Sequence, residues 1–121
     1  MLVVDPRSTT PPYEQLRLQL VAQIGRGELA PGTRLPAVRR LASDLGIAPN
    51  TVARTYRELE AAGFVRTAGR NGTIVTPPDD GSEIAREAAS LAAAYARGMR
   101  ALGLGPEAMI AYLHRALAGP A

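Results

Sequence analysis

The sequence LPAVRRLASDLGIAPNTVARTYRELEAAG, residues 35–63, predicts two helices joined by a tight turn. In its first half, apolar residues recur at intervals of three and four, as they do on one face of a helix. These residues are Val38, Leu41, Ala42 and Leu45. Pro36 suits the opening turn of this helix, where a missing N–H does no harm. Gly46 then stands where helices commonly end with a residue in the left-handed region.

The second helix of this stretch is expected from about Pro49 to Ala62, and Gly63 stops it. At about 100° per residue, it has one face for burial and one polar face. The first contains Val52, Thr55, Tyr56 and Leu59, and the second contains Asn50, Arg54 and Arg57. In a DNA major groove, asparagine can pair with adenine and arginine with guanine through two hydrogen bonds. The helix is therefore either the recognition helix of a helix-turn-helix or an amphipathic helix with a solvated polar face.

A third helix is expected just after Thr10-Pro11-Pro12. The prolines fit a first helical turn, and Thr10 or a neighbour can cap it. Its apolar stripe contains Tyr13, Leu16, Leu20 and Ile24. This helix supplies the third face that closes a small core. Ahead of it, Leu2-Val3-Val4 alone is a weak strand signal.

After the second helix the apolar pattern changes to that of a β-hairpin. Residues 64–67 and 73–76 are the expected strands around the loop Ala68–Gly72, in which Asn71-Gly72 is a strong turn signal. A hairpin directly after a recognition helix is a wing. Arg70 at its tip is flanked by glycines, which let the backbone approach a phosphate closely. A hairpin that only covers the core would also explain the strands, without calling for the charged tip.

Residues 82–121 predict two more amphipathic helices after a polar linker, residues 77–81. Ser82 can cap the first, which reaches about Leu102, and the last runs from Glu107 to Ala118. Their apolar faces contain Ile84, Ala88, Leu91, Tyr95, Leu102, Met109, Ile110, Leu113 and Leu117. Two such helices cannot close a core alone, so they must pack on the preceding domain or on a second chain. Small residues on the first helix allow close approach and favour a four-helix arrangement of two chains.

Length, composition and charge exclude several classes of protein. A chain of 121 residues is one domain, or one small domain with an appendage. No apolar run approaches the ~20 residues of a membrane span, and Leu2-Val3-Val4 is too short for a signal-peptide core. Cysteine is absent, which excludes disulfides and thiolate metal sites. Residues 1–76 hold ten arginines against six acidic residues, and residues 77–121 hold four against five. The positive charge therefore coincides with the candidate DNA-reading part.

No pattern in the sequence is typical of an enzyme. The only histidine, His114, lies on an Ala-rich helix without a carboxylate pattern around it. A phosphate loop, a nucleophile elbow and a metal-ligand cluster are all absent from the sequence. We therefore expect no catalytic residue, no metal site and no cofactor.

Four blocks of sequence, in order and at their spacing, resemble the GntR family of bacterial transcription regulators. They are Pro12-Tyr13-Glu14-Gln15-Leu16, Pro31-Gly32-x-x-Leu35-Pro36-x-x-Arg39-x-Leu41-Ala42, Pro49-Asn50-Thr51-Val52-x-Arg54-x-Tyr56-x-x-Leu59-Glu60-x-x-Gly63 and Gly69-x-x-Gly72-Thr73-x-Val75. Details of the third block resemble the YtrA and MocR branches. MocR members carry a large aminotransferase-like domain for which these residues leave no room, so the YtrA branch fits better.

The resemblance covers residues 2–76 and implies a winged helix-turn-helix. In that family a short N-terminal strand pairs with the wing, so Leu2-Val3-Val4 is expected to be a strand. The expected DNA-binding residues are Arg39, Asn50, Thr51, Arg54, Arg57, Gly69 and Arg70. Ala37 and Ala48 stand at capping positions that usually hold polar residues, so each helix start loses about 1 kcal/mol. Pro49 and Ala53 replace arginines that other branches use on DNA.

The predicted fold is α+β and mostly helical. A winged helix-turn-helix domain (residues 1–76) is followed by a linker (77–81) and a two-helix dimerisation tail (82–121), as in the YtrA branch. The expected dimer-interface residues are Ile84, Leu91, Tyr95, Leu102, Ile110 and Leu113. The predicted function is that of a cytoplasmic, sequence-specific repressor that binds an inverted-repeat operator as a homodimer. The competing interpretation is a winged-helix protein-interaction module without DNA readout.

A small-molecule effector is left open. Two short helices should leave no ligand-sized pocket within the tail of one chain, because such pockets enclose roughly 300–1,000 Å³. An effector would then bind between protomers, or near Pro77–Ser82.

Overall fold

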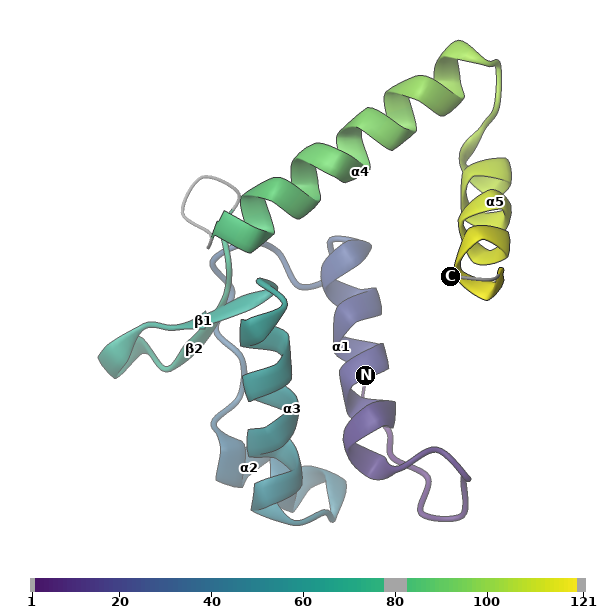
Figure 1. Cartoon of the computed structure of the whole chain (residues 1–121). Coiled ribbons are helices and arrows are strands. Elements are labelled where there is room, and N and C mark those ends of the chain that lie inside the picture. The colour runs from purple at the N-terminus through teal and green to yellow at the C-terminus, as the bar shows by residue number, and fades with distance from the viewer. Residues whose placement is uncertain (1, 78–82, 120–121) are drawn as a thin grey trace. The chain divides into compact units, whose positions relative to one another are not determined.

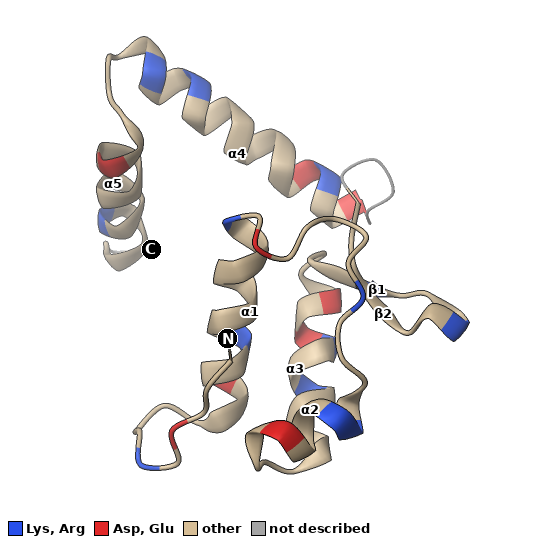
Figure 2. Cartoon of the chain, turned by 180° about the vertical axis from the view of Figure 1, so that it is seen from behind, with Lys and Arg blue, Asp and Glu red and all other residues tan. Residues whose placement is uncertain are grey.

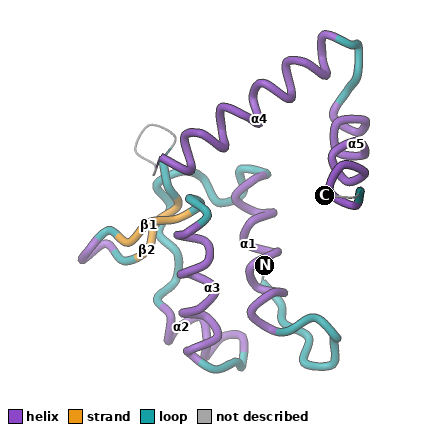
Figure 3. The backbone as a smooth tube through the Cα atoms, viewed as in Figure 1, coloured by secondary structure: helices purple, strands orange, loops and turns teal. Residues whose placement is uncertain are grey.

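The structure is a computed structural model that describes residues 2–77 and 83–119. In chain order its elements are α1 (Pro12–Gly25), α2 (Val38–Leu45), α3 (Pro49–Ala61), β1 (Val65–Thr67), η1 (Gly69–Asn71), β2 (Thr73–Val75), α4 (Glu83–Ala101) and α5 (Pro106–Ala118) (Figure 1). Among the described residues, strands occur only in the hairpin, so the α+β, mostly helical fold is confirmed (Figure 3). The chain divides into two compact units, Met1–Arg86 and Glu87–Ala121.

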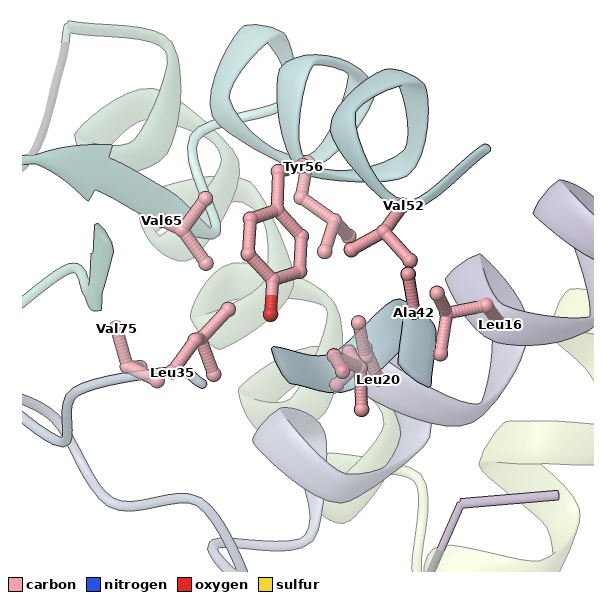
Figure 4. Packing of buried hydrophobic residues seen from close by; sticks show 10 residues of the cluster. Leu16, Leu20, Leu35, Ala42, Val52, Tyr56, Val65 and Val75 are labelled. Atoms are coloured by element: carbon pink, nitrogen blue, oxygen red, sulfur yellow. The ribbon is translucent and has the colours of Figure 1, made fainter. Parts of the chain in front are cut away.

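The first unit has a core built around α3, which packs against α1, α2 and β1. Leu16 and Leu20 of the stripe predicted for α1, and the buried face predicted for α3, point into this core, together with residues of α2, the hairpin and the segment before α2 (Figure 4). Its buried apolar residues are Leu16, Leu20, Leu35, Leu41, Ala42, Val52, Tyr56, Leu59, Val65 and Val75. Tyr13 of the α1 stripe is not part of the core. The predicted buried face of α3 is confirmed in full, including Thr55.

Two buried hydroxyl groups fix α3 to its neighbours. The Thr55 hydroxyl lies 3.1 Å from the carbonyl oxygens of Tyr13 and of Thr51, so it can donate to either. The Tyr56 hydroxyl donates to the carbonyl oxygen of Pro36 at 2.7 Å. Burial raises the pKa of Tyr56 to about 12. Pro36 itself lies just ahead of α2 and does not open it, because the first turn begins at Val38.

Helices α1, α2 and α3 of the first unit begin without side-chain capping bonds. The N-caps of α2 and α3 are Ala37 and Ala48, and neither makes a side-chain capping bond, as predicted. Thr10 or a neighbour is expected to cap α1, and the N-cap is its neighbour Pro11, which makes no side-chain capping bond. The Thr10 carbonyl instead accepts a hydrogen bond from the Gln15 side chain at 2.7 Å.

Two glycines end the helix-turn-helix elements in left-handed conformations. Gly46 caps α2 with φ of 70°, as predicted. Gly63 follows α3 with φ of 87°, and a Cβ there would lie 2.8 Å from the Cβ of Ala85 in the first turn of α4. Gly63 is therefore required both by its backbone conformation and by this close approach.

The N-terminal segment is not a strand, so the expectation for Leu2-Val3-Val4 is wrong. Two glutamines of α1 take up its backbone groups. The Gln19 side chain accepts from the Val3 N–H at 2.9 Å and donates to the Val3 carbonyl at 2.5 Å. The Gln15 side chain binds the N–H and carbonyl of Asp5 in the same way, at 2.8 and 2.9 Å. Each side-chain amide thus replaces a strand partner.

The predicted wing is present as the antiparallel pair β1–β2. Val65 faces Val75 and Thr67 faces Thr73 across the ladder, and η1 forms the tip. Residues 32–35 run along the other edge of β2, where Arg34 and Ile74 form a β-bridge. The wing is therefore braced by the segment that leads into α2, and not by the N-terminus.

Helices α4 and α5 match the predicted tail helices. The Tyr95 hydroxyl donates to the Met109 carbonyl at 2.7 Å and joins the two helices. Neither helix contains a buried residue among those described. Ser82, the expected N-cap, and residues 78–81 of the expected linker lie outside the described part of the chain. None of the helices that the structure describes combines the length and apolar character of a membrane span.

Candidate nucleic-acid interface

The residues predicted to bind DNA lie on α2, α3 and the tip of the wing, all in the first compact unit. Basic residues are found on all three elements (Figure 2). Thr51 is half-buried, and the remaining predicted residues are exposed: Arg39, Asn50, Arg54, Arg57, Gly69 and Arg70. The structure thus leaves the predicted surface open to a ligand.

Three of the predicted arginines have no partner within the part of the chain that the structure describes. Among the described residues, the guanidinium groups of Arg39, Arg57 and Arg70 form no hydrogen bond or ion pair. Arginines without a partner keep all five N–H donors available. Such a set, spread over α2, α3 and η1, suits the phosphates of a polyanion.

Arg54 differs from these three. Its guanidinium carbon lies 3.7 Å from the centre of the Tyr13 ring, on the first turn of α1. Its Nε lies 3.1 Å from a carboxylate oxygen of Glu58, one turn further along α3. The Arg54 side chain is still 54% exposed. The spacing of Arg54 and Glu58 is visible in the sequence, but the stacking on Tyr13 was missed because Tyr13 was assigned only to the apolar stripe of α1.

Arg34 is a basic residue near the wing that the sequence reasoning missed. It is exposed, and a Cβ added at Gly72 would lie 3.3 Å from its Nε. An open hollow of about 440 Å³ lies between this arginine and the start of α2. It is lined by Arg34, Leu35, Pro36, Ala37, Arg40 and Asp44. Arg40 is held to Asp44 at 3.6 Å. The β-bridge to Ile74 brings Arg34 to the wing, and no local pattern indicates that pairing.

The predicted interface residues of the tail are all exposed in the single chain. Three of them, Tyr95, Leu102 and Leu113, line an open groove of about 430 Å³ within the second unit. The sequence predicts no pocket that encloses a ligand within the tail, and because this groove is open to solvent, that expectation stays a prediction. Tyr95 also joins the two helices, because its hydroxyl donates to the Met109 carbonyl at 2.7 Å.

The surface formed by α2, α3 and the wing offers hydrogen-bond donors for anions. Among the described residues, no group of three or more histidine, cysteine, aspartate or glutamate side chains is placed to hold a metal ion. His114 lies exposed on α5, in the other compact unit. The chemistry available at α2, α3 and the wing is thus hydrogen bonding by arginine, asparagine and backbone N–H groups.

Comparison with known proteins gives a consistent result. Residues 12–75 match the sequence profile of the bacterial regulatory proteins of the gntR family. The chain is 47% identical to the HTH-type transcriptional regulator Rv1152 of Mycobacterium tuberculosis over 93% of this chain and 90% of that protein. It is 42% identical to the HTH-type transcriptional repressor YtrA of Bacillus subtilis over 63% of this chain and 58% of that protein. A solved structure of YtrA from Sulfolobus acidocaldarius, a GntR-family transcription factor, matches with a TM-score of 0.65 and 30% identity, covering 95% of both chains.

Proposed function

This chain belongs to the gntR family of bacterial regulatory proteins, and we propose that it is a cytoplasmic repressor that binds an inverted-repeat operator as a homodimer. It is a YtrA-like, DNA-binding transcription regulator and not an enzyme. The observation that carries the proposal is the set of exposed, unpaired arginines on α2, α3 and the wing of the described structure. The repressor role is supported by the name of the relative from Bacillus subtilis.

In this proposal α3 reads bases and its neighbours bind the phosphates. Asn50 and Arg54 lie on the N-terminal half of α3, which in helix-turn-helix proteins meets the base edges. Arg39 and Arg70 lie on α2 and at the wing tip, where contacts to the backbone are expected. Thr51, Arg57 and Gly69 complete the proposed DNA surface.

The tail is proposed to hold two chains together. Residues 1–76 are then the DNA-binding domain, residues 77–81 the linker and residues 82–121 the dimerisation tail. Large apolar side chains on α4 and α5 are exposed in the single chain, Leu91 by 66% and Ile110 by 59%. Apolar surface of this kind gains free energy when a partner covers it. A second copy supplies the same face, which makes the interface isologous and the operator two-fold symmetric.

Selection of bound sites from a random pool of duplex DNA, using the full chain, tests the proposal. We expect selected sites with two-fold symmetry. Arg54→Ala should lower affinity by about 1–3 kcal/mol and relax the preference at one base pair per half-site. Arg70→Ala should weaken binding to all sequences alike and reduce the salt dependence. Arg97→Ala, an exposed arginine of α4, is the matched control and should change neither.

Two results would contradict the proposal. Selected sites without two-fold symmetry would contradict the binding of an inverted-repeat operator by a dimer. Absence of any preferred site would favour a protein-interaction module instead.

A further inference from the structure

Arg54 is held on two sides by other side chains of the first compact unit. The Tyr13 ring covers one face of the guanidinium, at 3.7 Å from its carbon to the ring centre. Glu58 occupies the Nε–H at 3.1 Å. Among the described residues, the two terminal nitrogens of Arg54 have no hydrogen-bond partner. The free edge is therefore the terminal one, which carries four N–H groups.

This free edge has the geometry that base reading needs. An arginine binds guanine through two parallel N–H groups directed at O6 and N7. The face covered by Tyr13 and the Nε–H bound by Glu58 are not needed for that terminal approach. Arginine side chains have many rotamers, and ordering one on binding costs affinity. A side chain already held in place avoids much of that cost.

Tyr13 is itself firmly positioned for this role. It lies in the first turn of α1, directly after Pro12. Its carbonyl oxygen lies 3.1 Å from the buried Thr55 hydroxyl, and Thr55 is the neighbour of Arg54 on α3. The backbone under the ring and the backbone under the guanidinium are thus tied to each other.

We propose that Tyr13 and Glu58 are positioning residues for base reading, which hold the Arg54 guanidinium with its terminal edge directed at a guanine of the operator. The inference rests on the proposed function, because it requires that Arg54 contacts a base. It adds a residue of α1, outside the helix-turn-helix pair, to those that determine sequence specificity.

Binding by the full chain to a site selected from random duplex DNA tests this inference. For each variant, fluorescence anisotropy at fixed salt gives the discrimination ratio. This is the Kd for a duplex with one base pair replaced, divided by the Kd for the selected duplex. The base pair concerned is first identified as the one whose preference Arg54→Ala relaxes.

Tyr13→Leu should lower this ratio about two- to fivefold at that base pair, the range of an exposed cation–π contact, and leave the other positions unchanged. Tyr13→Phe keeps the ring and should retain the wild-type ratio. Glu58→Gln should lower the ratio at the same base pair. Its loss of negative charge strengthens binding to all sequences, but this effect cancels in the ratio. Because Glu58 is part-exposed on the surface of α3, this variant keeps the test available if Tyr13→Leu does not fold.

The outcomes separate the inference from the proposed function. Equal effects of Tyr13→Leu on every duplex would mean a purely structural role and overturn the inference, as would unchanged ratios in both Tyr13→Leu and Glu58→Gln. If Arg54→Ala alters no base preference of the selected site, the inference is overturned, but the protein is still a DNA-binding regulator. Only the absence of any preferred site overturns both.

Discussion

The two compact units use similar amphipathic helices with opposite results. In the first, the apolar faces of α1, α2 and α3 and the inner face of the hairpin meet around one core. In the second, α5 and the part of α4 that begins at Glu87 leave their large apolar residues exposed and bury none among the described residues. The difference shows that an amphipathic pattern predicts a buried face, but the number of facing elements decides whether one chain can bury it.

Polar side chains show the same contrast. In the first unit, the hydroxyls of Thr55 and Tyr56 bind carbonyl groups of other segments and fix α3. In the second, the comparable bond from Tyr95 to Met109 is exposed, and Tyr95 lines an open groove. We therefore expect the first unit to fold by itself and the second to depend on a partner.

Removing the second unit should have the largest effect. A protein of residues 1–86 keeps Ala85 against Gly63 and should be folded and monomeric. Its operator affinity should fall by about 10²- to 10⁴-fold. In a dimer the two DNA-binding domains are linked, so binding of the second half-site is intramolecular. Circular dichroism measures folding, sedimentation measures the oligomeric state, and fluorescence anisotropy measures operator affinity. Leu113→Glu in the full chain is the control for lost dimerisation with the tail present.

A truncated protein that remains dimeric in sedimentation would place the interface in the first unit. An unfolded one would mean that its core needs the tail.

Replacing one leucine by alanine in each unit should have the second-largest effects, and these should differ in kind between the units. Leu59 is 1% exposed, and Leu59→Ala should lower the free energy of unfolding by about 2–5 kcal/mol at every protein concentration. Leu113 is 46% exposed, and Leu113→Ala should weaken dimerisation by about 1–3 kcal/mol. Urea unfolding at several protein concentrations distinguishes the effects. A concentration-independent loss in Leu113→Ala would mean that this leucine is covered within its own chain.

Alkaline pH should weaken the first unit through Tyr56. Burial raises its pKa to about 12, whereas an unfolded tyrosine ionises near pH 10. The stabilisation is complete below about pH 10 and is lost as pH rises to about 12, in total about 1–3 kcal/mol. The free energy of unfolding, measured from pH 9 to 12, should fall in this way in the wild type and in the tail variant Tyr95→Phe. Tyr56→Phe should lack it, and an equal decline there would assign the effect to other groups.

Local patterns predicted much of the first unit. The buried face of α3 was predicted residue by residue, because the spacing of Val52, Thr55, Tyr56 and Leu59 depends only on helix geometry. The end of α2 at Gly46 and the hairpin were also predicted from local signals, a glycine after the last helical turn and the Asn71-Gly72 turn between two apolar runs. The exposed positions of Asn50, Arg54 and Arg57 follow directly, because these residues lie opposite the buried face of α3.

Features that depend on how elements dock were not predicted. The amides of Gln15 and Gln19 replace a strand partner only because α1 lies beside the N-terminal segment. The stacking of Tyr13 on Arg54 joins residues from two helices that are far apart in the sequence. The bond from Tyr95 to the Met109 carbonyl joins residues of α4 and α5 that lie 14 positions apart in the sequence. In each case a versatile side chain has several possible partners, and only the tertiary structure selects one.

The smallest predicted effect concerns the helix starts. Pro49 opens α3 and Pro106 opens α5, and neither helix has a side-chain cap. Ala48 has the extended backbone of an N-cap, φ −68° and ψ 141°, so a serine there can accept from a free N–H of the first turn. Ala48→Ser should raise the free energy of unfolding by about 0.5–2 kcal/mol, measured without DNA.

Gly105→Ser is the matched change at the start of α5, with φ −93° and ψ −177°. It should add only a few tenths of a kcal/mol, because glycine is itself tolerated at an N-cap and alanine is not. Thermal unfolding of both variants compares the same new hydroxyl in the two units. Equal gains would mean that the two helix starts are equally limited by their missing caps. A larger gain in Ala48→Ser would show that alanine limits the start of α3 more than glycine limits the start of α5.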